Sequence, residues 1–533
     1  IRGISMAYIV PDSTIILLSN VPIQPNYSDT LYFTSVSEQT NYFLSKTLRR
    51  FDAQYYQRHT INKCRLNARA DDVDMCNYMM FQNTAFQGKW FYAFITSVEY
   101  INVNVAEITF EIDQLQSWYF EYSTMPCFVE RMHNATDNIG DNIVPENINC
   151  GEYVANGNFT YIDPDLSQKL VICLLFSSIA SGSSSAPATS NYDYVYSTGN
   201  IYLYHNTLAG RQALQLFLTQ YASQFASVLA LYMIPIWCIG PTQQNFNDGD
   251  ILADFVTGQD RPVVTCTIAN IDGTETLDGY VVRNNKLFTY PYNFLHVDNC
   301  QDIDMNLRYE FFADSPYLNF IQMGNVLPPV STVLYPVNYK NSAIYYNESV
   351  GISNYPQCPV AIDAYALWFT QNLIPDIIKL GGGAFGGMVN GSVGGAVGNT
   401  IGGISNIIAN GVQSSLQGDV VKGNTQNGNL ASSNSRLRYE YVRMSVNAMQ
   451  AKVIDDYFTA YGYAQNQIML PRNHTRTRFT YIKTKGCTIK GSLPNEAITV
   501  IQNVYDNGIR FWADKDQATV LNMLPANDVL NGV

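Results

Sequence analysis

The sequence predicts a mainly β protein with smaller α+β parts and one long hydrophobic, glycine-rich insertion. Charged residues make up only 14% of the chain, whereas aromatic residues reach 13% and include 38 tyrosines. This composition favours strands and assemblies with large buried interfaces. Runs of alternating apolar and polar residues supply the strand signal. The insertion, Gly381 to Gly418, contains no charged residue and no histidine.

The chain of 533 residues is long enough for about two to four domains. Composition shifts and turn residues divide it further. We expect an expression scar at 1–5 ahead of Met6, a β domain at 6–127, an inserted α+β domain at 128–287, returning strands at 288–360, a hydrophobic loop with a polar tether at 361–435, and an α+β domain at 436–533.

The first β domain is predicted from short apolar runs between turn residues. Residues 7–46 read as strands joined by turns, and 13–18 is an apolar strand. The clearest signal lies at 101–112, where apolar and polar residues alternate on both sides of a short break. These two runs predict a β-hairpin that turns around Ala106 and Glu107.

Helices are predicted in the two α+β parts. In the inserted domain, apolar residues at helical spacing predict an amphipathic helix over 211–226, followed by a buried strand over 228–237. In the C-terminal domain, Gly462 and Gly508 mark the ends of two helices. We expect helices at 447–461 and 495–506, and strands at 436–444, 478–485, 487–490 and 509–512.

The insertion has the features of a membrane hairpin. Glycine recurs at four-residue spacing, as at Gly383, Gly387 and Gly391, and this pattern lets helices approach closely in lipid. In water each interior glycine costs roughly 1 kcal/mol of helix stability against alanine. Since a bilayer core takes about 20 helical residues, the uncharged run is near enough for two passes. Charged residues at both ends favour a hairpin that turns near Asn399 and Thr400.

Two groups of residues follow from this interpretation. The residues expected to contact lipid are apolar or aromatic and lie in the insertion or just before it: Trp368, Phe369, Leu373, Ile374, Phe385, Met388, Val389, Val393, Val397, Ile401, Ile404, Ile407, Ile408, Val412 and Leu416. Amides fall on the opposite face of the second arm, and in several copies they could line a watery pore: Asn406, Asn410, Gln413 and Gln417.

Two other interpretations of the insertion stay open. A Gly/Ala/Val/Ser segment is also typical of a flexible loop, or of a glycine-rich element buried inside an oligomer. Because the segment holds several amides and many glycines, a lone hairpin is only marginally insertable, so insertion would need neighbouring copies.

Charge, cysteine and histidine content exclude several function classes. The net charge of −13 argues against a protein that grips nucleic acid, although an acidic wall suits nucleic acid that slides past. The ten cysteines are scattered without a CxxC pair, which predicts reduced, mostly buried thiols. The five histidines are also scattered, so no zinc or other metal site is expected.

No catalytic motif is recognisable. The chain lacks G-x-S-x-G, H-E-x-x-H and P-loop sequences, so we expect no enzyme activity, no catalytic residue and no cofactor. The pairs Asp302/Asp304 and Asp455/Asp456 are better explained as turns and helix starts than as a glycosidase pair. One basic patch is predicted to pair with acidic walls of a neighbouring subunit: Arg472, Arg476, Arg478, Lys483 and Lys485.

Several stretches carry a resemblance to a known family. The strongest is 78–111, with Met80-Phe81-Gln82-Asn83 and then Gly88-Lys89-Trp90-Phe91-Tyr92-Ala93-Phe94; others are Asn20-Val21-Pro22, Tyr461-Gly462-Tyr463 and Asp506-Asn507-Gly508-Ile509. On these residues the chain resembles the tail knob, or distal tube, proteins of small short-tailed phages of Gram-positive bacteria. The likeness is greatest to those of streptococcal and staphylococcal podophages, and it is weak over about 150–280.

The resemblance implies a fold and a function. The β parts at 6–127, 288–360 and 436–533 would be tail-tube-like barrel or sandwich walls of a homo-oligomeric, six-fold tube at the virion tail tip. The tube would be assembled in the host cytoplasm and would contact other phage tail proteins. The hydrophobic loops would plug it and then enter the host cytoplasmic membrane, forming a channel through which phage DNA passes without specific binding.

Two competing functions remain open at this stage. The chain could be a purely structural or receptor-binding tail protein whose glycine-rich segment packs inside the oligomer. It could also be a tail-associated cell-wall hydrolase, which would need two carboxylates of unlike environment in one cleft.

Overall fold

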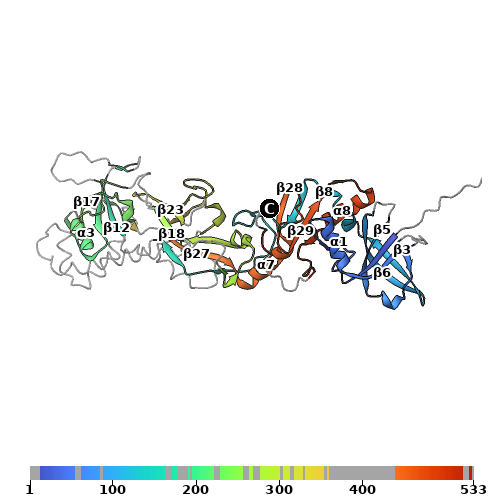
Figure 1. Cartoon of the computed structure of the whole chain (residues 1–533). Coiled ribbons are helices and arrows are strands. Elements are labelled where there is room, and N and C mark those ends of the chain that lie inside the picture. The colour runs from blue at the N-terminus through green and yellow to red at the C-terminus, as the bar shows by residue number, and fades with distance from the viewer. Residues whose placement is uncertain are drawn as a thin grey trace, which may run out of the picture. The chain divides into compact units, whose positions relative to one another are not determined.

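The computed structural model describes residues 13–54, 62–83, 88–162, 170–177, 190–192, 195–197, 199–220, 228–255, 263–267, 276–299, 304–312, 317–327, 331–352, 357–358, 439–519 and 527–530. The chain forms two compact units: unit 1 comprises 1–152, 273–289 and 447–533, and unit 2 comprises 153–272 and 290–446. Strands dominate both units (Figure 1), which confirms the predicted mainly β fold with α+β parts. The six-segment division of the chain stays a prediction.

Unit 1 contains two principal sheets. A six-stranded sheet has the order β3-β1-β5-β6-β7-β4, and a five-stranded sheet has the order β2-β31-β29-β9-β28. The strands of the first are β1 (Ser13–Ser19), β3 (Thr47–Gln54), β4 (Lys63–Leu66), β5 (Cys76–Asn83), β6 (Trp90–Asn102) and β7 (Val105–Ile112). Those of the second are β2 (Asp29–Leu31), β9 (Cys127–Met132), β28 (Tyr463–Met469), β29 (Phe479–Lys485) and β31 (Ile509–Trp512).

The remaining elements of unit 1 cover these sheets or pair beside them. They are α1 (Val36–Ser45), α2 (Gln114–Ser117), α7 (Ala448–Tyr461), α8 (Asn495–Asn507), β8 (Tyr122–Thr124), β30 (Ile489–Gly491), β19 (Thr276–Leu277) and β20 (Tyr280–Val281). One apolar cluster joins the two sheets, because Trp512 and Phe479 pack with Tyr78 and Phe94. A second cluster lies under α8, whose Ile501 and other buried residues pack against β9 and β29. The predicted C-terminal helices are therefore confirmed.

Unit 2 is built from three sheets around one apolar core. The first comprises β10 (Tyr153–Ala155), β11 (Thr160–Ile162), β21 (Asn293–Asp298), β22 (Asp304–Leu307) and β27 (Tyr439–Val446). The second comprises β12 (Leu170–Phe176), β15 (Asn200–His205), β16 (Val228–Pro235), β17 (Asp250–Ile251) and β26 (Gln357–Cys358). The third comprises β18 (Val263–Thr267), β23 (Tyr317–Gly324), β24 (Thr332–Val337) and β25 (Val350–Ile352), and a separate hairpin comprises β13 (Ser190–Tyr192) and β14 (Val195–Ser197).

The predicted helix–strand pair of the inserted domain is confirmed as α3 (Leu208–Gln220) and β16. β12 is buried along its whole length, since it lies between β15 and β16 in the sheet and Leu214 of α3 belongs to the same core. β16 ends at Pro235, which begins a short 3-10 turn and shortens the predicted strand by two residues.

Two local predictions were wrong. Residues 36–45 form α1 and not a strand: the Ser35 hydroxyl accepts from the Glu38 N–H (3.2 Å), and the Glu38 carboxylate accepts from the Thr34 N–H (2.8 Å). This Ser-x-x-Glu cap stabilises the first turn, and Phe43 then packs against Tyr78 and Tyr92 of the six-stranded sheet. The hairpin at 90–112 turns at 103–104, not at Ala106, and Asn102 pairs with Val105.

Candidate functional site

The insertion itself lies outside the described residues, together with every residue predicted to contact lipid or to line a pore. No placement is assigned to any of them, from Trp368 to Gln417. Within the described ranges, none of the helices is long and apolar enough to span a bilayer. The same ranges bring together no set of three His, Cys, Asp or Glu side chains suited to a metal ion. Seven cysteines are described as free thiols, and six of them are buried.

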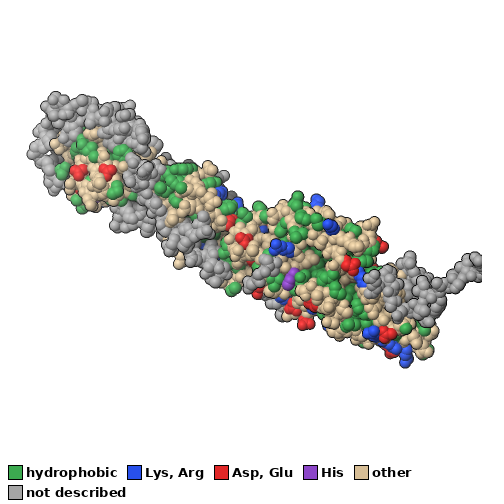
Figure 2. All heavy atoms as spheres, turned by 45° about the horizontal axis from the view of Figure 1, so that its top comes forward, with side chains coloured by type: hydrophobic (Ala, Val, Ile, Leu, Met, Phe, Trp, Pro, Cys, Tyr) green, Lys and Arg blue, Asp and Glu red, His purple; other side chains and the backbone are tan. Residues whose placement is uncertain are grey.

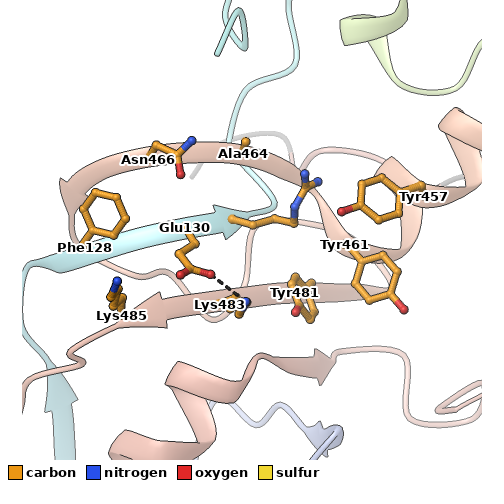
Figure 3. A pocket seen from close by; sticks show the side chains of 10 residues that line it. Phe128, Glu130, Tyr457, Tyr461, Ala464, Asn466, Tyr481, Lys483 and Lys485 are labelled. Carbon is orange, nitrogen blue, oxygen red and sulfur yellow. Dashed lines mark ion pairs between the residues drawn. The ribbon is translucent and has the colours of Figure 1, made fainter. Parts of the chain in front are cut away.

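Unit 1 carries a groove on the five-stranded sheet, at the end of α7 (Figure 3). Its volume is 540 Å³. Strands β9, β28 and β29 form its floor, and the last turn of α7 forms one end. The lining residues are Phe128, Glu130, Arg131, Tyr457, Tyr461, Ala464, Asn466, Tyr481, Lys483 and Lys485. We call this feature the sheet groove.

Strand alternation explains why these side chains face the groove. In β29, Ile482 belongs to the core under α8, whereas Tyr481 and Lys483 line the groove. In β9, Val129 and Met132 are buried in the same core, and a register shift between Val129 and Arg131 lets both Glu130 and Arg131 line the groove. Because successive side chains point to opposite faces of a strand, one face of the sheet is covered by helix and the other face is open.

Helix α7 reaches the groove because it is capped at both ends. The Asn447 side chain accepts from the Gln450 N–H (2.9 Å), and Gly462 ends the helix with φ 66°. The two tyrosines of the groove, Tyr457 and Tyr461, are one turn apart, with ring centroids 5.2 Å from each other. The chain then turns directly into β28.

Replacing Gly462 by alanine is expected to destabilise unit 1 by roughly 2 kcal/mol, through positive φ and a backbone clash. A Cβ atom there would lie 2.4 Å from the carbonyl carbon of Met132. Thermal melting followed by circular dichroism should show a midpoint several degrees lower. Gly486→Ala is the matched control, because Gly486 has φ 68° but no atom near its Cβ position. Equal melting points for the two variants would contradict the packing part of this account.

Cations and aromatic rings alternate along the groove. Lys483 pairs with Glu130 at 2.8 Å, and this hydrogen bond raises the pKa of Lys483. The Arg131 guanidinium lies 4.6 Å from the centre of the Tyr457 ring and donates to the Gly462 carbonyl at 2.6 Å. The sheet groove therefore combines three cations with one carboxylate, Glu130, among its lining residues.

Buried ion pairs hold the groove in place from below. Glu146 accepts from Arg131 and from Lys286 (2.5 Å), and the side chains of Glu146 and Lys286 are both buried. Asp455 of α7 is also buried and accepts from the Arg283 N–H (2.9 Å) and the Asn284 N–H (3.1 Å). These bonds tie α7 to the segment 276–289, which returns from unit 2. Asp455 is thus a structural anchor of α7.

His133 links three elements beneath the groove. Its Nδ1 atom accepts from the Tyr481 N–H (2.8 Å), and its Nε2 atom lies 3.2 Å from the Thr459 carbonyl oxygen. The ring is therefore neutral, with the proton on Nε2. Burial, and after it the charge of Arg476, lower the pKa of His133 to about 3.

The predicted basic patch at 472–485 was wrong as a single surface. Arg476 and Arg478 are buried, with Arg476 next to Asp137 and Arg478 donating to Gln517. Only Lys483 and Lys485 of the predicted set line the sheet groove. In Figure 2, blue and red side chains are scattered between large green areas, so the visible face is not a continuous basic surface.

The groove favours recognition over catalysis. A hydrolase site needs two carboxylates in unlike environments, and the lining residues of the groove include only Glu130, which is paired with Lys483. Sequence reasoning missed this site. Its signals were the one-turn spacing of Tyr457 and Tyr461 and the alternation of Tyr481, Lys483 and Lys485, but neither shows which face of the sheet is open.

Comparison with known proteins places the chain among phage tail components. Residues 263–528 match the family model for the C-terminal domain of the Bacillus phage phi29 tail knob protein gp9. Residues 11–123 match the model for the N-terminus of caudoviral major tail proteins. The tail knob protein gp9 of Bacillus phage B103 is 24% identical, over 95% of this chain and 98% of its own length. The chain is a relative of the phage tail knob proteins.

A second relative and one solved structure agree with this relationship. The gp9 tail knob protein of Bacillus phage PZA is 26% identical over 96% of this chain and 98% of its own length. The structure of the bacteriophage C1 tail knob protein, gp12, has a TM-score of 0.63 at 14% identity, and the match covers 97% of this chain and 100% of that one. This last likeness concerns the fold. The predicted relationship to tail knob proteins of small podophages is thus confirmed.

Proposed function

We propose that this chain is a non-enzymatic virion protein whose copies form the distal tube of a phage tail, most simply a hexamer. Phage DNA passes through the lumen of that tube. The main support is that tail knob relatives match more than nine-tenths of the chain, including both the first β domain and the C-terminal region. The low charge content of the sequence also suits large contacts between copies. A closer kinship to streptococcal and staphylococcal knob proteins stays a prediction.

The proposal includes a membrane role for the insertion. The segment 381–418 falls between β26 and β27 in the sequence and is free of charge over its whole length. Copies held in a ring would bring several insertions together. Each hairpin, which is only marginally insertable alone, would then have neighbouring hairpins to pack against in lipid. We propose that these loops close the tube in the virion, assembled in the host cytoplasm with other tail proteins, and then enter the host cytoplasmic membrane.

Electron microscopy and mass photometry of the purified full-length protein test the assembly. The expected result is a ring with a central hole and a mass that is six times that of one chain. A protein that stays monomeric at micromolar concentration, alone and with its neighbouring tail proteins, would rule out the tube. A ring of another subunit number would correct the stoichiometry alone. The membrane role is tested separately by vesicle leakage.

A further inference from the structure

The hairpin formed by β6 and β7 exposes apolar residues at its tip. Every residue from Glu99 to Asn104 is exposed, and Tyr100, Ile101 and Val103 are 65%, 41% and 61% exposed. The tip is well ordered, because the Asn104 N–H donates to the Asn102 side-chain oxygen at 2.9 Å. Contiguous apolar exposure on a fixed turn is typical of an interaction site. We call residues 99–104 the hairpin tip.

The hairpin tip stands clear of the core of its own unit. The first half of β6 is fixed there, since Tyr92 and Phe94 pack in the cluster that contains Trp512. Further along, Val98 of β6 and Ala106 of β7 pack in the second apolar cluster of the six-stranded sheet, so only the turn extends past the core. Asn102 pairs with Val105 at the base of that turn.

The sheet groove has the complementary chemistry. It offers aromatic surface, since Phe128 and Tyr457 are each 37% exposed, and beside it Ile468 is 75% exposed and pairs across the ladder with Phe128. It also offers Lys485, for which no ion pair occurs within the described residues. The hairpin tip carries an acid, Glu99, whose side chain stays 52% exposed although its carboxylate lies 3.6 Å from Lys63 of the same chain.

We propose that the hairpin tip of one copy of this chain inserts into the sheet groove of the next copy. This inference rests on the homo-oligomeric part of the proposed function. Apolar residues of the tip would cover Phe128 and Tyr457, and Glu99 would approach Lys485. Because the chain has a net charge of −13, two copies repel each other overall. A local pair of opposite charges therefore favours association through these two surfaces over others. Because the two surfaces differ, the contact is head-to-tail, which is the kind of contact that forms a ring when the rotation between copies closes.

Two full-length variants separate the halves of this contact. The tip variant carries Ile101→Asp and Val103→Asp, and the groove variant carries Tyr457→Ala and Lys485→Glu. Each alone is expected to assemble roughly 100-fold more weakly than the natural chain, because both lose apolar contact at the centre of the interface. Met75→Asp is the matched control: Met75 is 78% exposed in unit 1 but lies in neither surface. It should assemble normally, and circular dichroism should show all variants folded.

Mixing the two variants gives the decisive result. The groove variant retains an unchanged hairpin tip, and the tip variant retains an unchanged sheet groove. One chain of each variant can therefore form a single natural contact, and the resulting dimer has no unchanged surface left for a third chain. Mass photometry should therefore show monomers for each variant alone and dimers, but no rings, for the mixture. Rings from either variant alone, or monomers from the mixture, would overturn this contact between the hairpin tip and the sheet groove. Neither result would contradict the proposal that the natural chain forms an oligomer. If the natural chain itself never oligomerises, the proposed tube fails as well.

A cysteine pair checks the geometry directly. Val103→Cys and Asn466→Cys, placed on separate chains and mildly oxidised, should give an interchain disulfide. Val103→Cys with Met75→Cys should give none. The alternative partner of the hairpin tip is a lipid surface. If the natural chain binds phosphatidylglycerol vesicles, and the tip variant loses that binding but still forms normal rings, the tip contacts lipid and the contact between copies is contradicted.

Discussion

Deleting residues 381–418 from the full-length protein is expected to abolish leakage of dye from anionic vesicles, while assembly stays unchanged. The segment carries the charge-free, glycine-spaced run and most of the residues that are predicted to contact lipid. A replacement by a Gly/Ser linker of equal length is the matched control, because it keeps chain connectivity and removes only the apolar side chains. It should also be inactive. Leakage that persists in both variants would rule out the membrane role and favour a segment buried in the oligomer.

Substitutions within the segment test its lipid-facing side and its pore-facing side separately. Ile404→Asp with Ile408→Asp places charges on the lipid-facing side, and each costs about 2.5–3.5 kcal/mol at a bilayer centre, so leakage should fall at least tenfold. Asn406→Asp with Asn410→Asp should preserve leakage and raise cation selectivity in planar bilayers, because these residues are predicted to line the pore. Equal loss of activity from both pairs would contradict the assignment of faces.

The fold could be predicted where local and global signals agree. The helix at 448–461 has an asparagine cap, helical apolar spacing and Gly462 at its end, and each signal is local to the sequence. The strand at 13–19 was predicted from its apolar run. The helix at 36–45 carried an equally local signal, the Ser35–Glu38 capping box, but the neighbouring turn residues favoured a strand interpretation.

The site could not be predicted in the same way, because its features depend on long-range partners. Arg476 and Lys483 are both cations in one β region, yet Asp137 lies beside the first in the interior and Glu130 beside the second in an open groove. Asp455 resembles an exposed helix acid until the segment around Arg283 returns from unit 2 to bind it. Ion pairs and hydrogen bonds between residues more than a hundred positions apart produce no periodic pattern in a single sequence.

Acid is expected to destabilise unit 1 through His133. The depressed pKa means that the unfolded chain binds a proton more readily than the folded one between pH 6.5 and about 3. The stabilising effect of the neutral ring is fully present above pH 6.5 and is lost as pH falls through that window. Between pH 7 and pH 4 the loss should be on the order of 3 kcal/mol, since each pKa unit is worth about 1.4 kcal/mol. Urea midpoints at the two pH values measure it.

Other groups also titrate in this window, so a variant is needed to isolate His133. Burial raises the pKa of Asp113 to about 6, and this carboxyl stabilises the fold as pH falls, with the opposite sign. In His133→Asn the amide oxygen can still accept from the Tyr481 N–H but gains no proton. The variant should be less stable than the natural chain at pH 7 and should lose less on acidification. His205→Asn, a change on an exposed side chain of unit 2, should leave the acid response of unit 1 unchanged.

The structural reason for this acid response lies in the two bonds of the imidazole. Protonating Nδ1 would set an N–H against the Tyr481 N–H, and the charged ring would face the positive charges of Arg476 and Arg510. Strand β29 and the end of helix α7 would then separate at the point where Tyr481, Tyr457 and Tyr461 form the sheet groove. Acid should therefore weaken contacts between copies at a higher pH than it unfolds the chain. An assembly whose mass is unchanged down to the pH of unfolding would contradict that order of events.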